Sequence, residues 1–451
     1  MHNIKESKVR TDGHPASALA IASQPQIDDV MKIEQGFQQQ QPPSLHPFLD
    51  DPVLPVLVKR LFPPSSHARV VEELTRFGND INGYISDLGK FVGPPTLIQY
   101  DHFGQRIDQL KTSEGWRQLK QVAAKEGMVP IAYDRANYGT HALPTAELEL
   151  QDTIGFLLLD PSQSQGAIKP NGVRAIAPVL NITRVHSAAT SIGNLAKCLG
   201  IARSYARVRR VAGPAPGRVR TQVLLADVPL HTATLARIEV LRHALTHFLF
   251  GVVQLLGASE VGTATDSERE RLRLLTPVLK AFAADRAVGG MEECMAALGG
   301  LGYMEETGIG RLIRDSLVEK IWEGTTNVLA LDMIRAARGG AIKAFSRITD
   351  EQWSRAIIAQ HPGPSIELVK RLTLLESLNL ANCSSHARLA LVLVARLASA
   401  SYLMQHAQWS RLELDNVIAH RWIEDELEGK LVWDADRDWD KVIVYQYATK
   451  L

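Results

Sequence analysis

A mainly α-helical fold is predicted for this 451-residue chain, and three features of the sequence predict it. Apolar residues recur at helical spacing through most of the second half of the chain. Four long amphipathic segments joined by loops lie between residues 179 and 343, the pattern of an antiparallel four-helix bundle. Only two or three short segments are typical of strands, too few to close a barrel. We therefore expect a helical bundle with a small β segment and extra C-terminal helices.

The first part of the chain divides by composition. Residues 1–45 are rich in Gln, Ser and Pro and have little apolar surface to bury, so we expect a disordered tail. Residues 46–131 show helical periodicity, with a turn and a short extended piece within residues 102–108, and form an N-terminal helical region. Residues 132–178 alternate in the manner of strands. The expected strands are 146–150, 154–159 and 173–176.

The bundle follows from residue 179 to residue 343. Its second helix carries apolar residues between Leu235 and Val252, and its third carries apolar residues between Leu272 and Phe282 and is expected to end at Gly289-Gly290. Residues 344–430 add at least two further helices, one marked by Leu389, Leu393, Leu397 and Leu403. The tail, 431–451, has no clear period.

Composition limits the function classes. The formal net charge of +1 predicts no bulk attraction to nucleic acid. Three widely spaced cysteines give neither a disulfide framework nor a metal-ligand spacing, so no metal site is predicted. No apolar run reaches transmembrane length on this reading, so no membrane span is expected.

The prediction of a functional site depends on one stretch of the chain, residues 291–338. It breaks at the glycines of 299–303, resumes as a helix, and turns sharply at Glu323-Gly324 before another helix. Thr325 stands where a cap is expected, and a helix N-terminus is a natural seat for an anion or a polar ligand. Residues that only end one helix and begin the next would produce the same pattern.

Two motifs in this stretch resemble a known family. The runs LGGLGY and IWEGTTNVLALDMIR are similar to the C-terminal signature of FAD-dependent acyl-CoA dehydrogenases. The tryptophan before the glutamate, and the run LNITRVHSAATSIG with Arg184 matching the arginine that opens this helix, resemble the AidB-type branch. The resemblance implies an acyl-CoA dehydrogenase-like bundle that removes α and β hydrogens from an acyl-CoA thioester. It implies that Glu323 is the catalytic base.

The resemblance also implies an FAD site and a homo-oligomer, either a dimer or a tetramer. Arg209 matches the arginine that holds the FAD pyrophosphate across a subunit interface, although Ala212 replaces the phenylalanine of that motif. A solvated arginine, a glycine C-cap and a capping threonine are the structural alternatives for these positions. The residues implied in cofactor binding are Arg209, Gly299, Gly300, Gly302, Thr325 and Asn327.

The same resemblance indicates that most of the family's middle β-domain is missing. Residues 132–135 still match the N-terminal region, whereas 137–146 already match the far end of the β-domain, so 132–178 is a remnant. A splice form, a mistaken gene model and a genuine loss are equally compatible with this gap. The alternative function is therefore a catalytically impaired helical interaction protein that assembles with a full-length relative.

Two further expectations concern partners and compartment. In the AidB-type branch the extra helices are linked to DNA, but residues 365–430 here contain seven Lys/Arg against eight Asp/Glu, so nucleic acid is not an expected partner. The chain ends in Thr449-Lys450-Leu451, one residue from a peroxisomal address. Peroxisome and cytoplasm are the two expected locations.

Overall fold

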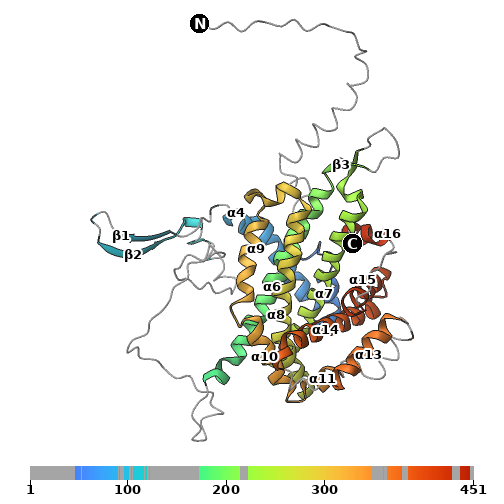
Figure 1. Cartoon of the computed structure of the whole chain (residues 1–451). Coiled ribbons are helices and arrows are strands. Elements are labelled where there is room, and N and C mark those ends of the chain that lie inside the picture. The colour runs from blue at the N-terminus through green and yellow to red at the C-terminus, as the bar shows by residue number, and fades with distance from the viewer. Residues whose placement is uncertain are drawn as a thin grey trace, which may run out of the picture.

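The computed structural model describes residues 46–121 with short gaps, 172–213, 222–346, 363–377, 384–428 and 437–446. Within this part the fold is mainly α-helical, as predicted, with three long helices side by side (Figure 1). The tail 1–45, the expected strands 146–150 and 154–159, and residues 447–451 lie outside the described residues.

The bundle is built on three long helices that pack on one another: α6 and α8 are parallel, and α7 is antiparallel to both. α8 begins at a capping box, in which Thr265 accepts from the Glu268 backbone N–H and the Glu268 side chain accepts from the Thr265 backbone N–H. Leucine and alanine side chains fill the space between the helices. The bundle helices are α6 (Gly172–Ala206), α7 (Pro229–Glu260), α8 (Asp266–Ala297), α9 (Ile309–Leu317) and α10 (Thr326–Ala337).

The predicted end of the third helix at Gly289-Gly290 is wrong, because α8 continues to Ala297. A Cβ on Gly290 would lie 2.8 Å from Leu195 Cδ1, so α8 packs closely on α6 here and a larger residue would have to displace the end of the Leu195 side chain. A glycine inside a helix costs about 1 kcal/mol relative to alanine. Close packing of the two helices explains why the sequence carries it.

The strand expected at 173–176 is also wrong, because α6 begins at Gly172 and includes these residues. Four alternating residues are too short a signal to separate a strand from a helical turn. The bundle therefore starts several residues before the predicted boundary at 179.

Two small antiparallel hairpins stand apart from the bundle. The extended piece expected after residue 105 is confirmed as β2 (Arg106–Lys111), whose partner β1 (Thr96–Tyr100) the sequence reading missed. β3 (Arg210–Ala212) pairs with β4 (Gln222–Leu224) just beyond the end of α6. The N-terminal helices are α2 (Leu54–Leu61), α3 (Pro64–Asp80) and α4 (Ser86–Gly89).

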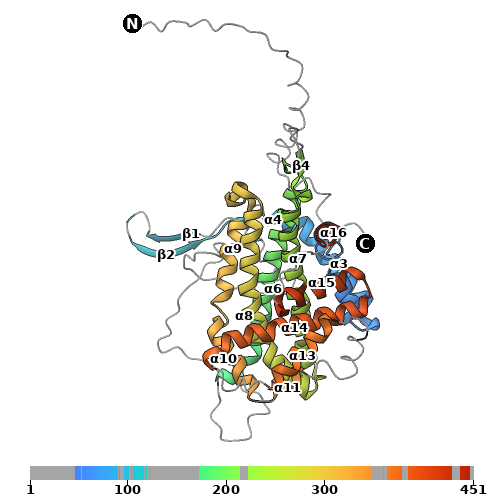
Figure 2. The same ribbon diagram turned by 45° about the vertical axis from the view of Figure 1, so that its right-hand side comes forward.

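The C-terminal helices cross the lower part of the bundle (Figure 2). α14 packs on α7, α8 and α10, and buries Leu397 and Leu403 as predicted, but Leu389 is 69% exposed at its first turn. The tail is folded where it is described, with Ile443 and Val444 buried against the bundle. The elements are α11 (Ala341–Ser346), α13 (Pro364–Ser377), α14 (Ala387–Ser410), α15 (Glu413–Ile423), α16 (Arg437–Lys441) and the π-helical turn Val442–Gln446.

A buried polar seam joins α7 to α14. Arg242 donates to Glu239 (2.7 Å), and His243 Nε2 lies 3.4 Å from the same carboxylate. The rings of His247 and His406 stand 4.3 Å apart between their centroids. Such groups must be paired or neutral to be buried at low cost.

Two helical segments, Pro229–Glu260 and Ser384–Ser410, are long and apolar enough to cross a membrane by length and composition. The expectation that no apolar segment reaches that length is wrong for these two. In each, 72% of the apolar window is buried inside the protein, which is how core helices of a bundle acquire this composition.

Candidate active site

Glu323 lies in a sharp turn between α9 and α10, in a backbone conformation that is rare for its residue type. Its φ is 58°, the left-handed region, which costs a residue with a Cβ about 1–2 kcal/mol. Gly324 follows with φ 106°. Strain of this kind persists only where surrounding contacts hold it, and it is concentrated at functional sites.

Three consecutive main-chain carbonyls of this turn accept hydrogen bonds from two cationic side chains. Lys280 Nζ donates to Trp322 O (2.6 Å) and to Gly324 O (2.8 Å). Arg184 Nε donates to Glu323 O (3.2 Å), while its other arm donates to Asp332 of α10 (3.0 Å). Arg184 lies well inside α6, so the expectation that it opens this helix is wrong.

The Glu323 carboxylate is tied to α6 by one oxygen. Thr183 Oγ1 donates to Glu323 Oε2 at 2.6 Å, and the other carboxylate oxygen makes no hydrogen bond to a described residue. Large apolar side chains surround the turn and are exposed: Ile321 (64%), Trp322 (42%) and Val328 (49%). A carboxylate with one free oxygen beside an apolar surface is suited to an apolar substrate.

A second carboxylate, Glu319, is buried directly beneath the turn. It accepts from Ser187 Oγ and from Trp322 Nε1, each at 2.5 Å, and this fixes the indole. Burial raises the pKa of Glu319, against the hydrogen bonds from Ser187 and Trp322. Burial lowers the pKa of the neighbouring Lys280 to about 8, although Glu319 and Glu323 favour its charged form.

Thr325 and Asn327 begin α10 and are exposed. Thr325 stands at the N-cap, but its side chain makes no capping hydrogen bond. The capping alternative therefore does not explain its hydroxyl. The first turn of α10 presents this hydroxyl, the Asn327 amide and the helix N-terminus to solvent, a group of donors suited to a polar ligand edge.

The remaining predicted residues lie at the other end of the bundle. Arg209 follows the C-terminal end of α6, and a helix rises about 1.5 Å per residue, so it lies roughly 35 Å from Thr183. Both views place the β3–β4 hairpin and α10 at opposite ends of the bundle (Figures 1 and 2). A single chain does not bring Arg209 and Glu323 together.

The three glycines between α8 and α9 have different structural reasons. Gly299 has a φ of 62°, as a helix C-cap requires, and a Cβ on Gly302 would lie 2.0 Å from Met295 O. A Cβ on Gly300 would meet nothing within 4 Å, and its φ is not positive. Among these three, Gly300 is the one that no contact with a described residue explains, so the hypothesis of close approach by a ligand is kept for Gly300.

These residues fit the pyrophosphate end of FAD. Arg209 is exposed, and no other described residue forms an ion pair or hydrogen bond with its side chain. Gly300 leaves open space at the same end of the bundle, where parallel α6 and α8 both end. An unpaired guanidinium beside a surface without a Cβ suits phosphate oxygens.

Two other arginines near the end of α6 bind the C-terminal segment. Arg203 donates to Val444 O (3.5 Å), Arg207 donates to Tyr445 O (3.3 Å), and the Arg207 guanidinium lies over the Tyr445 ring. A structural role therefore explains these two, and Arg209 remains the candidate phosphate ligand.

The sequence reading missed Lys280, Thr183 and Glu319. Lys280 was visible in principle, since it interrupts the apolar run Leu279-Lys280-Ala281-Phe282 on a core helix. A lysine at a buried position needs acceptors from the same fold. No sequence pattern identified those acceptors as the carbonyls around Glu323.

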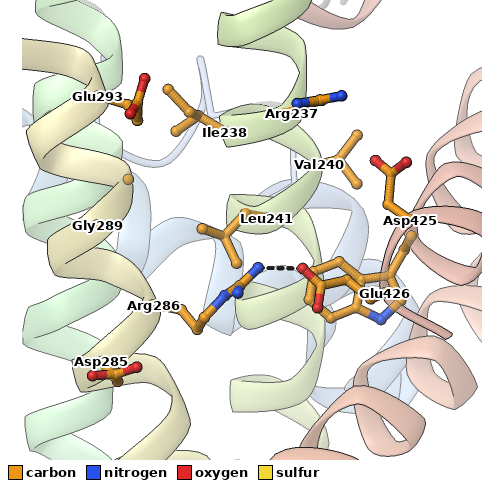
Figure 3. A pocket seen from close by; sticks show the side chains of 12 residues that line it. Arg237, Ile238, Val240, Leu241, Asp285, Arg286, Gly289, Glu293, Asp425 and Glu426 are labelled. Atoms are coloured by element: carbon orange, nitrogen blue, oxygen red, sulfur yellow. Dashed lines mark hydrogen bonds and ion pairs between the residues drawn. The ribbon is translucent and has the colours of Figure 1, made fainter. Parts of the chain in front are cut away.

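A pocket of about 590 Å³ lies elsewhere, between α7, α8 and the end of α15 (Figure 3). Its lining is charged, with Arg237, Arg286, Asp425 and Glu426 around it and an ion pair between Arg286 and Glu426. Neither Glu323 nor Arg209 lines it. A hollow with charged walls does not suit an acyl chain, so we do not place the active site there.

Comparison with known proteins gives a family for the bundle. Residues 170–338 match the family described as "Acyl-CoA dehydrogenase, C-terminal domain". Acyl-CoA dehydrogenase family member 11 of Caenorhabditis elegans is 27% identical over 75% of this chain and 78% of its own length. The putative acyl-CoA dehydrogenase AidB of Escherichia coli is 29% identical over 44% of this chain, but over only 32% of its own length.

A solved structure of an acyl-CoA dehydrogenase family member is also similar to this chain. The crystal structure of Caenorhabditis elegans ACDH-11 in complex with C11-CoA is similar with a TM-score of 0.65 and 25% identity, covering 90% of this chain and 96% of that one. The sequence alignment with the nematode relative has 491 positions, which three quarters of a 451-residue chain cannot fill. That relative therefore carries a large block without a counterpart here. The predicted place of the gap, near residue 136, lies outside the described residues.

Proposed function

We propose that this chain is a member of the acyl-CoA dehydrogenase family that binds an acyl-CoA thioester at the Glu323 turn and abstracts its α-proton. The observation that carries the proposal is the Glu323 carboxylate, held in a strained turn with one free oxygen among exposed apolar side chains. The nematode relative's crystal complex with C11-CoA supports the substrate class. The extra C-terminal helices support the AidB-type branch as the chain's place in the family.

The base acts from a position set by its neighbours. Thr183 fixes one carboxylate oxygen, so the proton is accepted by the other. Trp322, the residue before the base, has its indole nitrogen held by Glu319.

FAD, when bound, supplies the acceptor for the β-hydride. The chain's residues for it lie at two ends of the bundle: Thr325 and Asn327 beside Glu323, and Arg209 and Gly300 at the far end. We infer that one cofactor meets the Glu323 end of one chain and the Arg209 end of another, so the functional unit is a homo-oligomer. This separation agrees with the subunit-bridging role implied for Arg209.

The test is Glu323→Gln, with Glu306→Gln as control for loss of an exposed carboxylate. The amide keeps the shape and the Thr183 contact but cannot accept a proton, so turnover falls by ~10²–10⁴. Deuterium wash-in at the substrate α-carbon measures proton abstraction without hydride transfer and falls equally. Unchanged wash-in in Glu323→Gln contradicts the role of the base.

A second candidate is an interaction protein that assembles with a full-length relative. The block that is present in the nematode relative but lacks a counterpart here favours it. Activity in saturating added FAD separates the two candidates: turnover by the purified homo-oligomer supports the enzyme. Flavin that appears only on co-expression with a full-length relative supports the partner role.

A further inference from the structure

We propose that Lys280 is a positioning residue for Glu323. By holding the carbonyls on both sides of Glu323, it keeps the turn in the conformation that presents the carboxylate. The link to catalysis rests on the proposed function, whereas the effect of Lys280 on the turn does not.

The geometry gives Lys280 two acceptors that bracket one residue. Its ammonium reaches Trp322 O at 2.6 Å and Gly324 O at 2.8 Å, and the residue is fully buried on α8. Arg184 binds the intervening carbonyl from α6 at 3.2 Å. The main chain of the turn is therefore anchored to both parallel helices, and the Glu323 side chain is held separately by its hydrogen bond from Thr183.

The turn needs such anchors because its backbone is strained. At Glu323 the φ of 58° places the Cβ close to the following carbonyl oxygen, so the relaxed chain prefers another conformation. Hydrogen bonds to charged donors are stronger than those between neutral groups, more so in a buried site. Two such bonds on either side of Glu323 oppose that relaxation.

A merely structural role, the filling of a core position, does not explain the choice of lysine. The neighbours Leu279, Ala281 and Phe282 are apolar and buried, and burial of a charged amine is costly. Glu319 and Glu323 face the ammonium and favour its charge, while Arg184 opposes it. A lysine suits this position because two of its donors reach the two carbonyls that flank Glu323.

Lys280→Met tests the proposal, because methionine keeps the length and removes every donor. Lys320→Met is the matched control, since Lys320 precedes the same turn but pairs with Asp285 at 3.0 Å. Hydrogen–deuterium exchange of the peptide 318–327 is compared with that of α7, and melting is followed by circular dichroism.

In Lys280→Met we expect exchange in 318–327 to rise roughly tenfold to a hundredfold, with α7 unchanged. Lys320→Met leaves it at the wild-type rate. With acyl-CoA, Lys280→Met lowers kcat and leaves KM nearly unchanged, since the thioester site remains. If Lys280→Met does not fold, Lys280→Gln, which retains two donors on a shorter chain, gives an intermediate rise.

Equal exchange of the turn in wild type and Lys280→Met overturns the proposal. So does a rise of the same size in α7, because it shows only general stabilisation. If the turn exchanges faster in Lys280→Met but the wild-type chain has no activity with acyl-CoA, the role of Lys280 in holding the turn stands. The proposed function is then refuted instead.

Discussion

Replacement of Glu323 by glycine and by alanine measures the strain stored at the site. Both substitutions remove the carboxylate and its 2.6 Å hydrogen bond from Thr183, a loss of about 1 kcal/mol in each. They differ at the backbone. Glycine adopts φ 58° without a Cβ clash, whereas alanine keeps the cost of about 1–2 kcal/mol.

Glycine also gains more freedom in the unfolded chain, which costs it roughly 0.5–1 kcal/mol. The difference leaves Glu323→Gly more stable than Glu323→Ala by up to about 1.5 kcal/mol, and close to wild type. The free energy of unfolding is measured by urea denaturation, with the slope checked to be the same for each variant.

The control is Ala189→Gly in α6, an exposed helical position where glycine is expected to destabilise by about 1 kcal/mol. The sign of the glycine effect therefore reverses between the two sites. If Glu323→Ala is the more stable variant, the turn does not hold a left-handed Glu323 and the argument from strain fails.

Three further outcomes are expected. Burial lowers the pKa of His231, His243 and His247, so the unfolded chain binds protons that the folded chain excludes. The free energy of unfolding is therefore highest above about pH 6.5 and falls on acidification by up to ~1.4 kcal/mol per pH unit for each histidine. Urea titrations at pH 7.5 and 5.5 measure this fall, which is expected to be shallower in His247→Leu. The resemblance implies that the missing β-domain contacts the flavin ring, and loss of a few such contacts weakens binding by roughly two to four decades. We therefore expect the purified chain to carry little flavin and added FAD to raise its Tm only slightly; stoichiometric flavin after gel filtration contradicts this. A fluorescent fusion with a free C-terminus gives weak peroxisomal puncta that disperse when Thr449-Lys450-Leu451 is deleted, and a diffuse signal from both constructs refutes the address.

The sequence by itself determined the helical bundle and the place of Glu323 in it. Helical periodicity identified α7 and α14, and glycines with a threonine identified the breaks after α8 and before α10. These are local signals, carried by spacing and by backbone preference within a few residues. The motif around Glu323 gave the resemblance to the acyl-CoA dehydrogenases, which the match over residues 170–338 supports for the bundle.

Local signals failed where a distant residue decides the outcome. Gly290 lies inside α8, where Leu195 of α6 packs against it, and Leu389 is exposed because the first turn of α14 buries only one of its sides. The tail has no period of its own, yet Val444 and Tyr445 fold onto arginines more than two hundred residues earlier.

Only the tertiary structure decided how the site is assembled. It joined Thr183 and Arg184, Lys280, and Glu323 from three segments that are remote in the chain. It also separated Arg209 from Glu323 by the length of α6, although the motifs place both in one site. The physical reason is that a motif specifies the backbone near its own residues, whereas hydrogen-bond partners and distances across a bundle depend on how whole helices pack.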